Sequence, residues 1–384
     1  MEKEQLRSLA AEMVAIRSVN PLNGLPGQGR GEAELAAFVE SRLLAAGIAS
    51  EQREAAPGRP SVVARIPGQR EDAIWFDAHL DTVSGEGMQF DPFVPRVEGD
   101  TLYGRGAADD KGSLAAMMAA MVAVAESGNR PPATLVLTAT ADEEYRMRGL
   151  LGLLEGGLRA KVAIVGEPSN LEIIVAHKGV ARFKLVTTGR AVHSSRPEMG
   201  VNAVYHMARV VQALEAYAKG GVGRETHPLL GKATLSVGVI RGGEYANVVP
   251  DRCEIEVDRR LLPGEEGRRA MADVRAYLAD AITEDVGMEL IGPDILVPAL
   301  SLPTDEPLVH AVSAAVRQVT GKAPLNGMMG TTHAGQLAER GIPALVFGPG
   351  AMGQAHTATE ELDLNQLEQA AQVYELLMRT GAGI

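Results

Sequence analysis

The 384-residue chain has one cysteine and no apolar run that could cross a membrane. Its longest apolar run, from Leu114 to Ala125, is far shorter than the ~20 residues that a bilayer requires, and it predicts a buried helix. Cys253 alone cannot form an internal disulfide, which favours a reducing compartment. Since no basic segment followed by an apolar one opens the sequence, we expect no signal peptide and a cytoplasmic protein.

An excess of positive charge is also absent. The formal net charge is −12, and the 37 Lys and Arg residues are dispersed, so we expect neither a nucleic acid nor a membrane as a partner. Low-complexity tracts and repeats are missing, and 46% of the residues are hydrophobic, as in globular proteins. Because single cores stop growing at ~250 to 300 residues, this length predicts two domains.

Two common enzyme motifs are missing as well. The chain contains no Gly-x-Ser-x-Gly, the motif that places a serine nucleophile in many hydrolases. Gly231-Lys232 and Gly321-Lys322 are each followed by Ala, where a phosphate-binding loop needs Ser or Thr. A serine hydrolase and a nucleotide-dependent enzyme are therefore disfavoured.

Strand-like and helical segments alternate along residues 60 to 176, which predicts an α/β fold with a mainly parallel sheet covered by helices. The expected elements are strands at 61–66, 74–78, 134–139 and 162–165 and a helix at 113–126. Gly321 is expected to end a helix that follows Pro303. Asp363 and Gln366 resemble a capping box at the start of the last helix.

Residues 180 to 290 follow a different order. Strands are expected at 181–188, 234–240, 253–261 and 288–296, and helices at 202–219 and 265–283. The order β-α-β-β-α-β is that of a ferredoxin-like domain. We therefore predict a catalytic metal-binding domain at 1–178 and 294–384, split by an inserted domain at 179–293.

Acidic and histidine residues recur at or just after the expected strand ends. In open α/β sheets, the crevice beyond the carboxyl ends of the strands binds ligands, so one site could collect them. Imidazole and carboxylate groups suit zinc, and a pair of metal ions needs a bridging carboxylate with terminal ligands on either side. The residues that supply this number are His79, Asp109, Glu144, Glu167 and His356.

Two further acidic residues, Asp81 and Glu143, lie beside these ligands in the sequence. Asp81 follows His79 by two residues, so in an extended chain its carboxylate lies on the same side and could orient the imidazole. Glu143 and Glu144 are adjacent and should point in different directions. One can then bind metal while the other handles protons.

The same segments resemble a known family, the dinuclear zinc metallopeptidases that include acetylornithine deacetylase, succinyl-diaminopimelate desuccinylase, aminoacylase and glutamate carboxypeptidase. The resemblance spans nearly the whole chain. The segments that carry it are Asp77-Ala78-His79-Leu80-Asp81-Thr82-Val83, Gly104-Arg105-Gly106-Ala107-Ala108-Asp109-Asp110-Lys111-Gly112, Ala141-Asp142-Glu143-Glu144, Gly166-Glu167-Pro168-Ser169 and His356-Thr357.

The resemblance implies a role for each matching residue. His79 and Glu167 would hold one metal ion and Glu144 and His356 the other, while the carboxylate of Asp109 would bridge the two ions. The resemblance also implies a cis peptide bond between Asp109 and Asp110, which would aim that carboxylate at both ions. Glu143 would be the general base and acid, and Asp81 would support His79. Two divalent ions per subunit are implied, zinc by expectation and cobalt or manganese as alternatives.

The resemblance further implies a homodimer formed through the inserted domain. His193 and Asn247 match family positions that reach the active site of the partner subunit. Arg260 matches an arginine that binds a substrate carboxylate, so the expected substrate is a small molecule with a carboxylate group. His193 would also stabilise the oxyanion that forms on the amide carbonyl.

The identity of the substrate stays open at this point. Hydrolysis of a small N-acyl amino acid is the first hypothesis, and a di- or carboxypeptidase acting on short peptides is the second. A metal-binding homologue without activity is a third, which the retention of Glu143 disfavours. His333 stands where many relatives have Asp, and it is a candidate substrate contact together with Lys178, next to His177.

Overall fold

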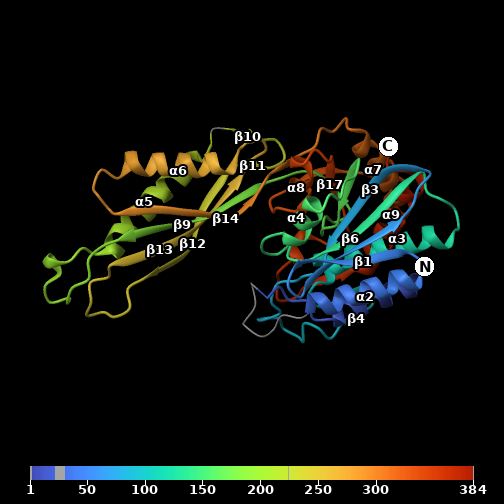
Figure 1. Ribbon diagram of the computed structural model, residues 1–384, viewed down its shortest axis with the longest axis horizontal. Coiled ribbons are helices and arrows are strands. Elements are labelled where there is room, and N and C mark those ends of the chain that lie inside the picture. The colour runs from blue at the N-terminus through green and yellow to red at the C-terminus, as the bar shows by residue number, and fades with distance from the viewer. Residues whose placement is uncertain (1, 22–30, 224, 384) are drawn as a thin grey trace. The chain divides into compact units, whose positions relative to one another are not determined.

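The computed structural model describes residues 2–21, 31–223 and 225–383, and it divides into two compact units (Figure 1). The main unit comprises Met1–Val175, Leu302–Asn326 and Thr332–Ile384, and the inserted unit comprises Ala176–Ser301 and Gly327–Thr331. The predicted boundary after residue 293 differs from this division. It would cut a strand that continues to Val297, where that residue is still paired with Val180.

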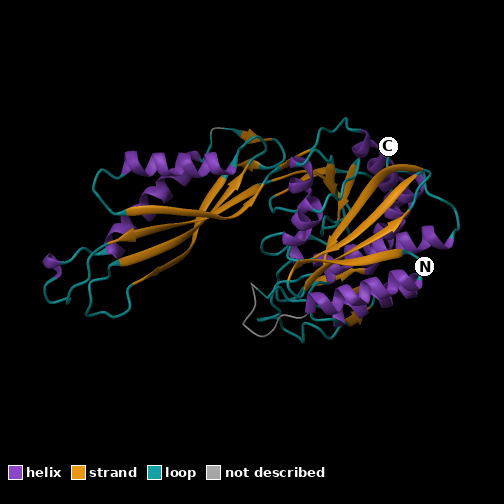
Figure 2. Ribbon diagram, viewed as in Figure 1, coloured by secondary structure: helices purple, strands orange, loops and turns teal. Residues whose placement is uncertain are grey.

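The main unit contains a nine-stranded sheet with a parallel centre (Figure 2). In sheet order, its strands are β1 (Ala49–Ala56), β2 (Arg59–Ile66), β6 (Ala133–Thr140), β3 (Arg70–His79), β7 (Val162–Val165), β17 (Ala344–Val346), β8 (Ile173–His177) and β15 (Leu300–Ser301), with β16 (Leu325–Met328) beside β8. The pairs β6–β3, β3–β7 and β7–β17 are parallel, and antiparallel pairs lie on both sides of them. The predicted α/β fold is confirmed.

Helices cover this sheet. They are α1 (Lys3–Ala15), α2 (Gly31–Ala45), α3 (Gly112–Glu126), α4 (Arg148–Glu155), α7 (Pro307–Thr320), α8 (His333–Glu339) and α9 (Leu364–Thr380). Helix α3 packs on β3 and β6, α8 on β7 and β17, and α2 and α4 on β1 and β2. Strand β7 is buried along its whole length, as expected for a parallel strand with both faces covered. The apolar run from Leu114 to Ala125 lies in α3 and confirms the predicted buried helix.

The inserted unit folds as β-α-β-β-α-β, as predicted. Its elements are β9 (Gly179–Thr188), α5 (Ala203–Gly221), β12 (Thr234–Gly242), β13 (Arg252–Leu261), α6 (Gly267–Ala281) and β14 (Met288–Val297). The antiparallel sheet has the order β12-β13-β9-β14, and Figures 1 and 2 show α5 and α6 on one face of it. Cys253 is buried in the core between this sheet and the helices, as a small apolar residue would be.

Smaller elements complete the fold. A three-stranded sheet contains β4 (Arg96–Glu98), β5 (Thr101–Tyr103) and β18 (Glu361–Asp363), and β10 (Thr226–His227) pairs with β11 (Gly231–Lys232). Short irregular turns are η1 (Ala107–Lys111), η2 (Pro197–Met199) and η3 (Met352–Gln354).

Two local predictions have different outcomes. Gly321 ends α7 with a φ of 79°, the left-handed conformation that glycine adopts without steric cost. Asp363 caps α9 by accepting a hydrogen bond from the Asn365 amide, but the reciprocal half of the capping box does not form. The Gln366 side chain instead accepts from the Gly350 amide and donates to Asn170, so it ties the helix to a neighbouring loop.

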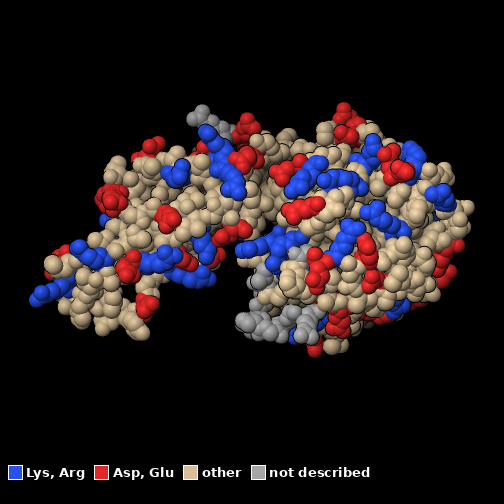
Figure 3. Space-filling model, in the orientation of Figure 1, with Lys and Arg blue, Asp and Glu red and all other residues tan. Residues whose placement is uncertain are grey.

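Charged side chains of both signs are interspersed over the face of the molecule that Figure 3 shows. In the inserted unit, Arg182 pairs with Asp258 at 2.8 Å, and Arg241 pairs with Glu256 at 2.9 Å. In the described part of the chain, no helix has the length and apolar character needed to span a membrane.

Candidate metal centre

The five predicted metal ligands all belong to the main unit, and three of them lie at or just after the end of a strand. His79 is the last residue of β3, Glu144 follows β6, and Glu167 follows β7. Asp109 lies in η1, ahead of α3, and His356 follows η3. Because β3, β6 and β7 run parallel, their carboxyl ends meet at one edge of the sheet.

These residues form two groups that share Asp109. In one group, ligand atoms of His79, Asp109 and Glu167 lie within 4.8 Å of one another, and in the other those of Asp109, Glu144 and His356 do. The Nε2 atom of His79 is 2.9 Å from Oδ1 of Asp109, whereas Nε2 of His356 is 3.4 Å from Oδ2. Each oxygen of one carboxylate therefore faces a different imidazole, which is the arrangement that a bridging ligand needs.

The groups differ in accessibility. His79, Asp109 and Glu167 are buried, while the side chain of His356 is 53% exposed and contacts Glu144 at 3.1 Å. The second group is therefore the one that solvent and a small molecule can reach.

The electrostatics of the site follow from the crowding of carboxylates away from water. Burial raises the pKa of Glu167 well above its usual range, and the charges of Asp109 and Glu143 raise it further. Burial and the charge of Asp109 likewise raise the pKa of Glu144. Hydrogen bonds to Asp109 and Glu144 raise the pKa of His356 to about 10. Buried anions are stable only when positive charge lies beside them, so this set of donors suits divalent cations.

Asp81 makes contacts beyond the predicted one with His79. The Nδ1 atom of His79 lies 2.8 Å from the main-chain carbonyl of Asp81 and 3.7 Å from its carboxylate, so the carbonyl is the closer partner of the imidazole. The buried carboxylate accepts hydrogen bonds from the amides of Glu143 and Glu144, each at 3.0 Å. Asp81 therefore holds the turn that carries both glutamates.

Glu143 is half-buried beside the ligands. Burial raises the pKa of its carboxyl group well above the usual range, and the charges of Glu144 and Asp81 raise it further. A raised pKa makes a carboxyl group hold a proton more readily, which suits a group that accepts a proton and then donates it. The Asp109-Asp110 peptide bond is cis, as the resemblance implies.

The part of the sequence that forms this centre matches a known family. The model of Peptidase family M20/M25/M40 matches residues 75–380, which is most of the chain. The chain belongs to that family. Members of the M20 family are metal-dependent hydrolases of amide bonds.

Individual relatives differ in the reaction that they are named for. The chain is 29% identical to the acetylornithine deacetylase of Myxococcus xanthus, over 94% of this chain and 93% of that protein. It is 24% identical to the N-formyl-4-amino-5-aminomethyl-2-methylpyrimidine deformylase of Bacillus subtilis, over 97% and 93%. Among solved structures, an M20 family metallo-carboxypeptidase from Sulfolobus solfataricus superposes with a TM-score of 0.81 over the whole of both chains at 18% identity.

His333 lies in a place that does not suit its predicted contact with substrate. Its side chain is 1% exposed in α8, and its Nδ1 atom is 2.6 Å from the buried carboxylate of Asp77 in β3. Asp77 also accepts a hydrogen bond from Thr138, which in turn accepts one from Trp75. In this M20 family member, His333 therefore belongs to a buried polar network in the core.

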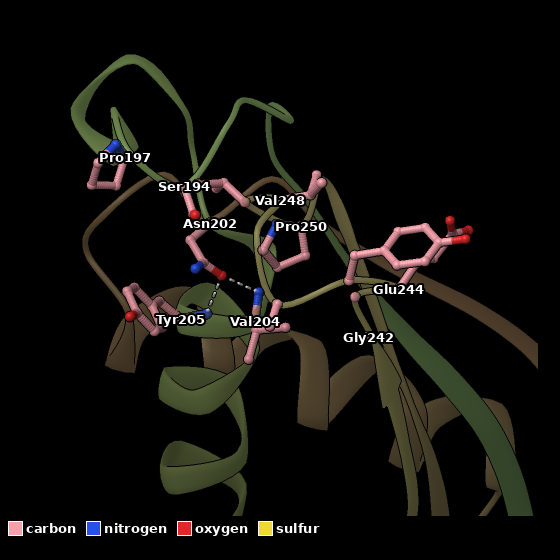
Figure 4. Close-up of a pocket in the computed structure, with 13 residues that line it drawn as sticks. Ser194, Pro197, Asn202, Val204, Tyr205, Gly242, Glu244, Val248 and Pro250 are labelled. Carbon is pink, nitrogen blue, oxygen red and sulfur yellow. Dashed lines mark hydrogen bonds between the residues drawn. The ribbon is translucent and has the colours of Figure 1, made fainter.

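The other predicted contacts belong to the inserted unit. His193 pairs with Val248 across an antiparallel bridge, and the amide of Ser194 donates to the carbonyl of Asn247 at 3.0 Å. The structure thus brings His193 and Asn247 together on exposed loops. A cavity of about 740 Å³ lies beside them, with Tyr205 and Ser194 among its lining residues (Figure 4).

Lys178 and Arg260 lie near each other in the same unit. The Nζ atom of Lys178 donates to the carbonyl of Lys232 at 2.7 Å, and Arg260 pairs with Asp258 at 2.7 Å. Burial lowers the pKa of Lys178, and the charge of Arg260 lowers it further. His177 is fully buried in β8, where burial lowers its pKa to about 4. The two cations can attract an anion, while His177 belongs to the interior.

Sequence reasoning missed the groups that hold the ligand-bearing loops. Asp142, with a φ of 70°, precedes the two glutamates, and its carboxylate contacts Arg59, Arg148 and Asn20. Glu360 accepts hydrogen bonds from the loop that carries Asp109. Its position four residues after His356 is the only local signal, since the residues that it contacts lie some 250 positions earlier.

Proposed function

We propose that this M20 family member hydrolyses the amide bond of a small N-acyl amino acid, using two divalent metal ions and Glu143. The observation that carries the proposal is the Asp109 carboxylate, whose two oxygens face the two separate ligand groups. His79 and Glu167 would hold one ion and Glu144 and His356 the other, with Asp109 between them.

Zinc is the metal that we propose, with cobalt and manganese as alternatives. Each group combines one imidazole with carboxylates, which are ligands that zinc accepts. When bound, such ions polarise a carbonyl oxygen and make water a stronger acid. His79 is suited to hold an ion because its Nδ1 atom faces the Asp81 carbonyl, which leaves Nε2 directed at Asp109.

Glu143 moves the protons in this proposal. Its carboxylate would accept a proton from the attacking water and deliver it to the nitrogen of the departing amine. The main-chain bond to Asp81 holds Glu143 in place, and the raised pKa makes transfer in both directions feasible. A metal-binding protein without activity has no use for such a group, which disfavours the inactive alternative.

The choice of an N-acyl amino acid rests on two observations. Two of the relatives that match nearly the whole chain are named a deacetylase and a deformylase, and both names denote removal of a small acyl group. Lys178 and Arg260, close together in the inserted unit, would bind the carboxylate of the substrate. The peptidase reading stays as the second candidate because the solved structure that we compared is named a carboxypeptidase.

A substrate panel tests the proposed reaction. Purified protein loaded with zinc, cobalt or manganese should release amine from N-acetyl, N-formyl or N-succinyl amino acids faster than from dipeptides. Substrates whose carboxylate is replaced by an amide serve as the matched control. They should show a higher KM, because the charged hydrogen bonds to Lys178 and Arg260 are lost. Preferential release from dipeptides would establish the peptidase reading instead.

We also propose that two copies pair through the inserted unit, so that His193 and Asn247 serve the partner's centre. Strand β12 is at the edge of its sheet in the described part of the chain. Large apolar side chains on this unit are exposed, with Tyr205 at 67% and Tyr245 at 68%. Exposed edges and apolar patches of this kind are suited to pairing with a second chain.

Mixed dimers test this arrangement. Suppose that His193→Ala and Glu143→Ala subunits, each nearly inactive alone, are unfolded and refolded together in equal amounts. In a mixed dimer, the centre on the His193→Ala subunit keeps its own Glu143 and receives His193 from its partner. One working centre in half of the dimers gives about a quarter of wild-type activity if subunits pair at random.

Each variant refolded alone is the control, and mass spectrometry verifies the mixed species. If His193 serves its own subunit, every centre in the mixture carries one defect. No recovery in verified mixed dimers would therefore exclude the shared centre.

A further inference from the structure

Glu360 is a buried carboxylate in the main unit, four residues after His356, with no exposed surface. Its Oε1 atom accepts hydrogen bonds from the amides of Ala108 and Asp109 at 3.0 and 3.1 Å. Its Oε2 atom accepts from the Gly106 amide at 3.1 Å and from Nη1 of Arg105 at 2.5 Å. Both oxygens are thus fully engaged by one loop.

The loop that Glu360 binds carries the shared ligand. Three of the four donors are main-chain amides between Gly106 and Asp109, and buried amides need acceptors. Gly106 has a φ of 85°, so the chain turns sharply there before it reaches Asp109. The amide of Asp109 itself bonds to Glu360, which places the backbone of that residue directly.

Arg105 extends the connection toward the other ligand-bearing segment. Its Nη2 atom donates to the carbonyl of Thr357 at 3.1 Å, one residue after His356. The Gly104 amide donates to the carbonyl of Glu360 at 3.2 Å. The segment from His356 to Glu360 and the loop from Gly104 to Asp109 are therefore joined by side-chain and main-chain bonds together.

We infer that Glu360 is a positioning residue that, with Arg105, sets the spacing between Asp109 and His356 and so allows both metal ions to bind together. The inference rests on the proposed function, because it concerns the same centre. Its physical basis is that a carboxylate accepts hydrogen bonds at both of its oxygens. No neutral side chain in its place could accept hydrogen bonds from all four donors.

Glu360→Gln is the sharpest substitution because it preserves the shape of the side chain. One end of the amide becomes an NH2 donor, which must then face either the Gly106 amide and Arg105 or the amides of Ala108 and Asp109. The NH2 group would then face two other hydrogen-bond donors with no acceptor between them, so the loop from Gly104 to Asp109 would have to move. Glu368→Gln is the matched control, because Glu368 is also a buried carboxylate, paired with Arg7 and Lys3 in the main unit.

Zinc titration of the metal-free proteins provides the main measurement. The wild type and Glu368→Gln should bind two ions per chain with the same affinities. In Glu360→Gln, the affinity for one ion should fall by about 10- to 100-fold, the usual effect of losing a group that orients a ligand. Two ions bound with wild-type affinity by folded Glu360→Gln would overturn the inference while leaving the proposed function intact.

Hydrogen exchange of the metal-free protein separates the possible failures. The amides of Ala108 and Asp109 should exchange faster in Glu360→Gln than in Glu368→Gln, before any metal is added. Unchanged exchange would overturn the inference. If the wild type binds no metal, both the proposed function and this inference are wrong. If Glu360→Gln does not fold, Arg105→Lys can replace it in the experiment. Lysine keeps the positive charge but cannot bond to Glu360 and Thr357 at the same time, so the affinity for the same ion should fall.

Discussion

Metal-free protein is expected to lose its amide hydrolysis and to regain it when two divalent ions per chain are restored. General acid-base catalysis by a group such as Glu143 supplies a factor of about 10² to 10⁴. Hydrolases accelerate their reactions by ~10⁶ or more, so the remainder must come from other parts of the site. If the five ligands of the two groups hold metal ions, as proposed, those ions would supply much of that remainder.

Amine release measured before and after chelation, with metal content from elemental analysis of the same samples, checks this. Metal removal should also lower the melting temperature, because ions that bind only the folded state stabilise it by about 2.7 kcal/mol at 100 times Kd. Full activity in protein verified to be metal-free would contradict the proposal. Recovery with one ion per chain would show that the second group is not required.

The second large effect is expected from Glu143→Ala. Turnover should fall by about 10² to 10⁴, while the metal content stays near that of the wild type. The reason is that Glu143 lies outside both ligand groups, although its carboxyl group is close enough for their charges to raise its pKa. Turnover number and metal content measured on the same preparation provide the check.

Glu144→Ala is the matched control for this prediction. It removes the neighbouring carboxylate, which belongs to the group with Asp109 and His356, so it should lower both activity and metal content. A loss of metal from Glu143→Ala would show instead that Glu143 is itself a ligand. If the two variants lost activity and metal to the same extent, Glu143 could not be distinguished from Glu144 as a proton carrier rather than a metal ligand.

The parts of the fold that were predicted correctly depend on local patterns. Apolar runs such as Leu114 to Ala125 specify an element and its burial without reference to the rest of the chain. The ligands were predictable for a related reason. His79, Glu144 and Glu167 lie at or just after parallel strands, and the ends of such strands converge whatever the details of packing.

The contacts that sequence reasoning did not foresee join residues far apart in sequence. His333 was assigned to the substrate, yet its partner Asp77 lies 256 positions away in a buried strand. Glu360 contacts Arg105 across 255 positions, and no pattern near Glu360 indicates this. The Asp81 carboxylate was predicted to support His79, which it faces at 3.7 Å, but it also binds the amides of Glu143 and Glu144, which only tertiary folding brings to it. Partners of buried polar groups follow from packing, which periodicity does not describe.

The order of the ligands along the chain bears on how the protein is made. One metal group is complete once residue 167 has been synthesised, but the other needs His356, which comes only after the whole inserted unit. Because synthesis and folding proceed from the N-terminus, a nascent chain would carry every ligand of the first group while the second group still lacks His356. The proposed second ion would therefore find its full set of ligands only when synthesis is almost finished, and a chain released before residue 356 would contain the ligands of the buried group alone.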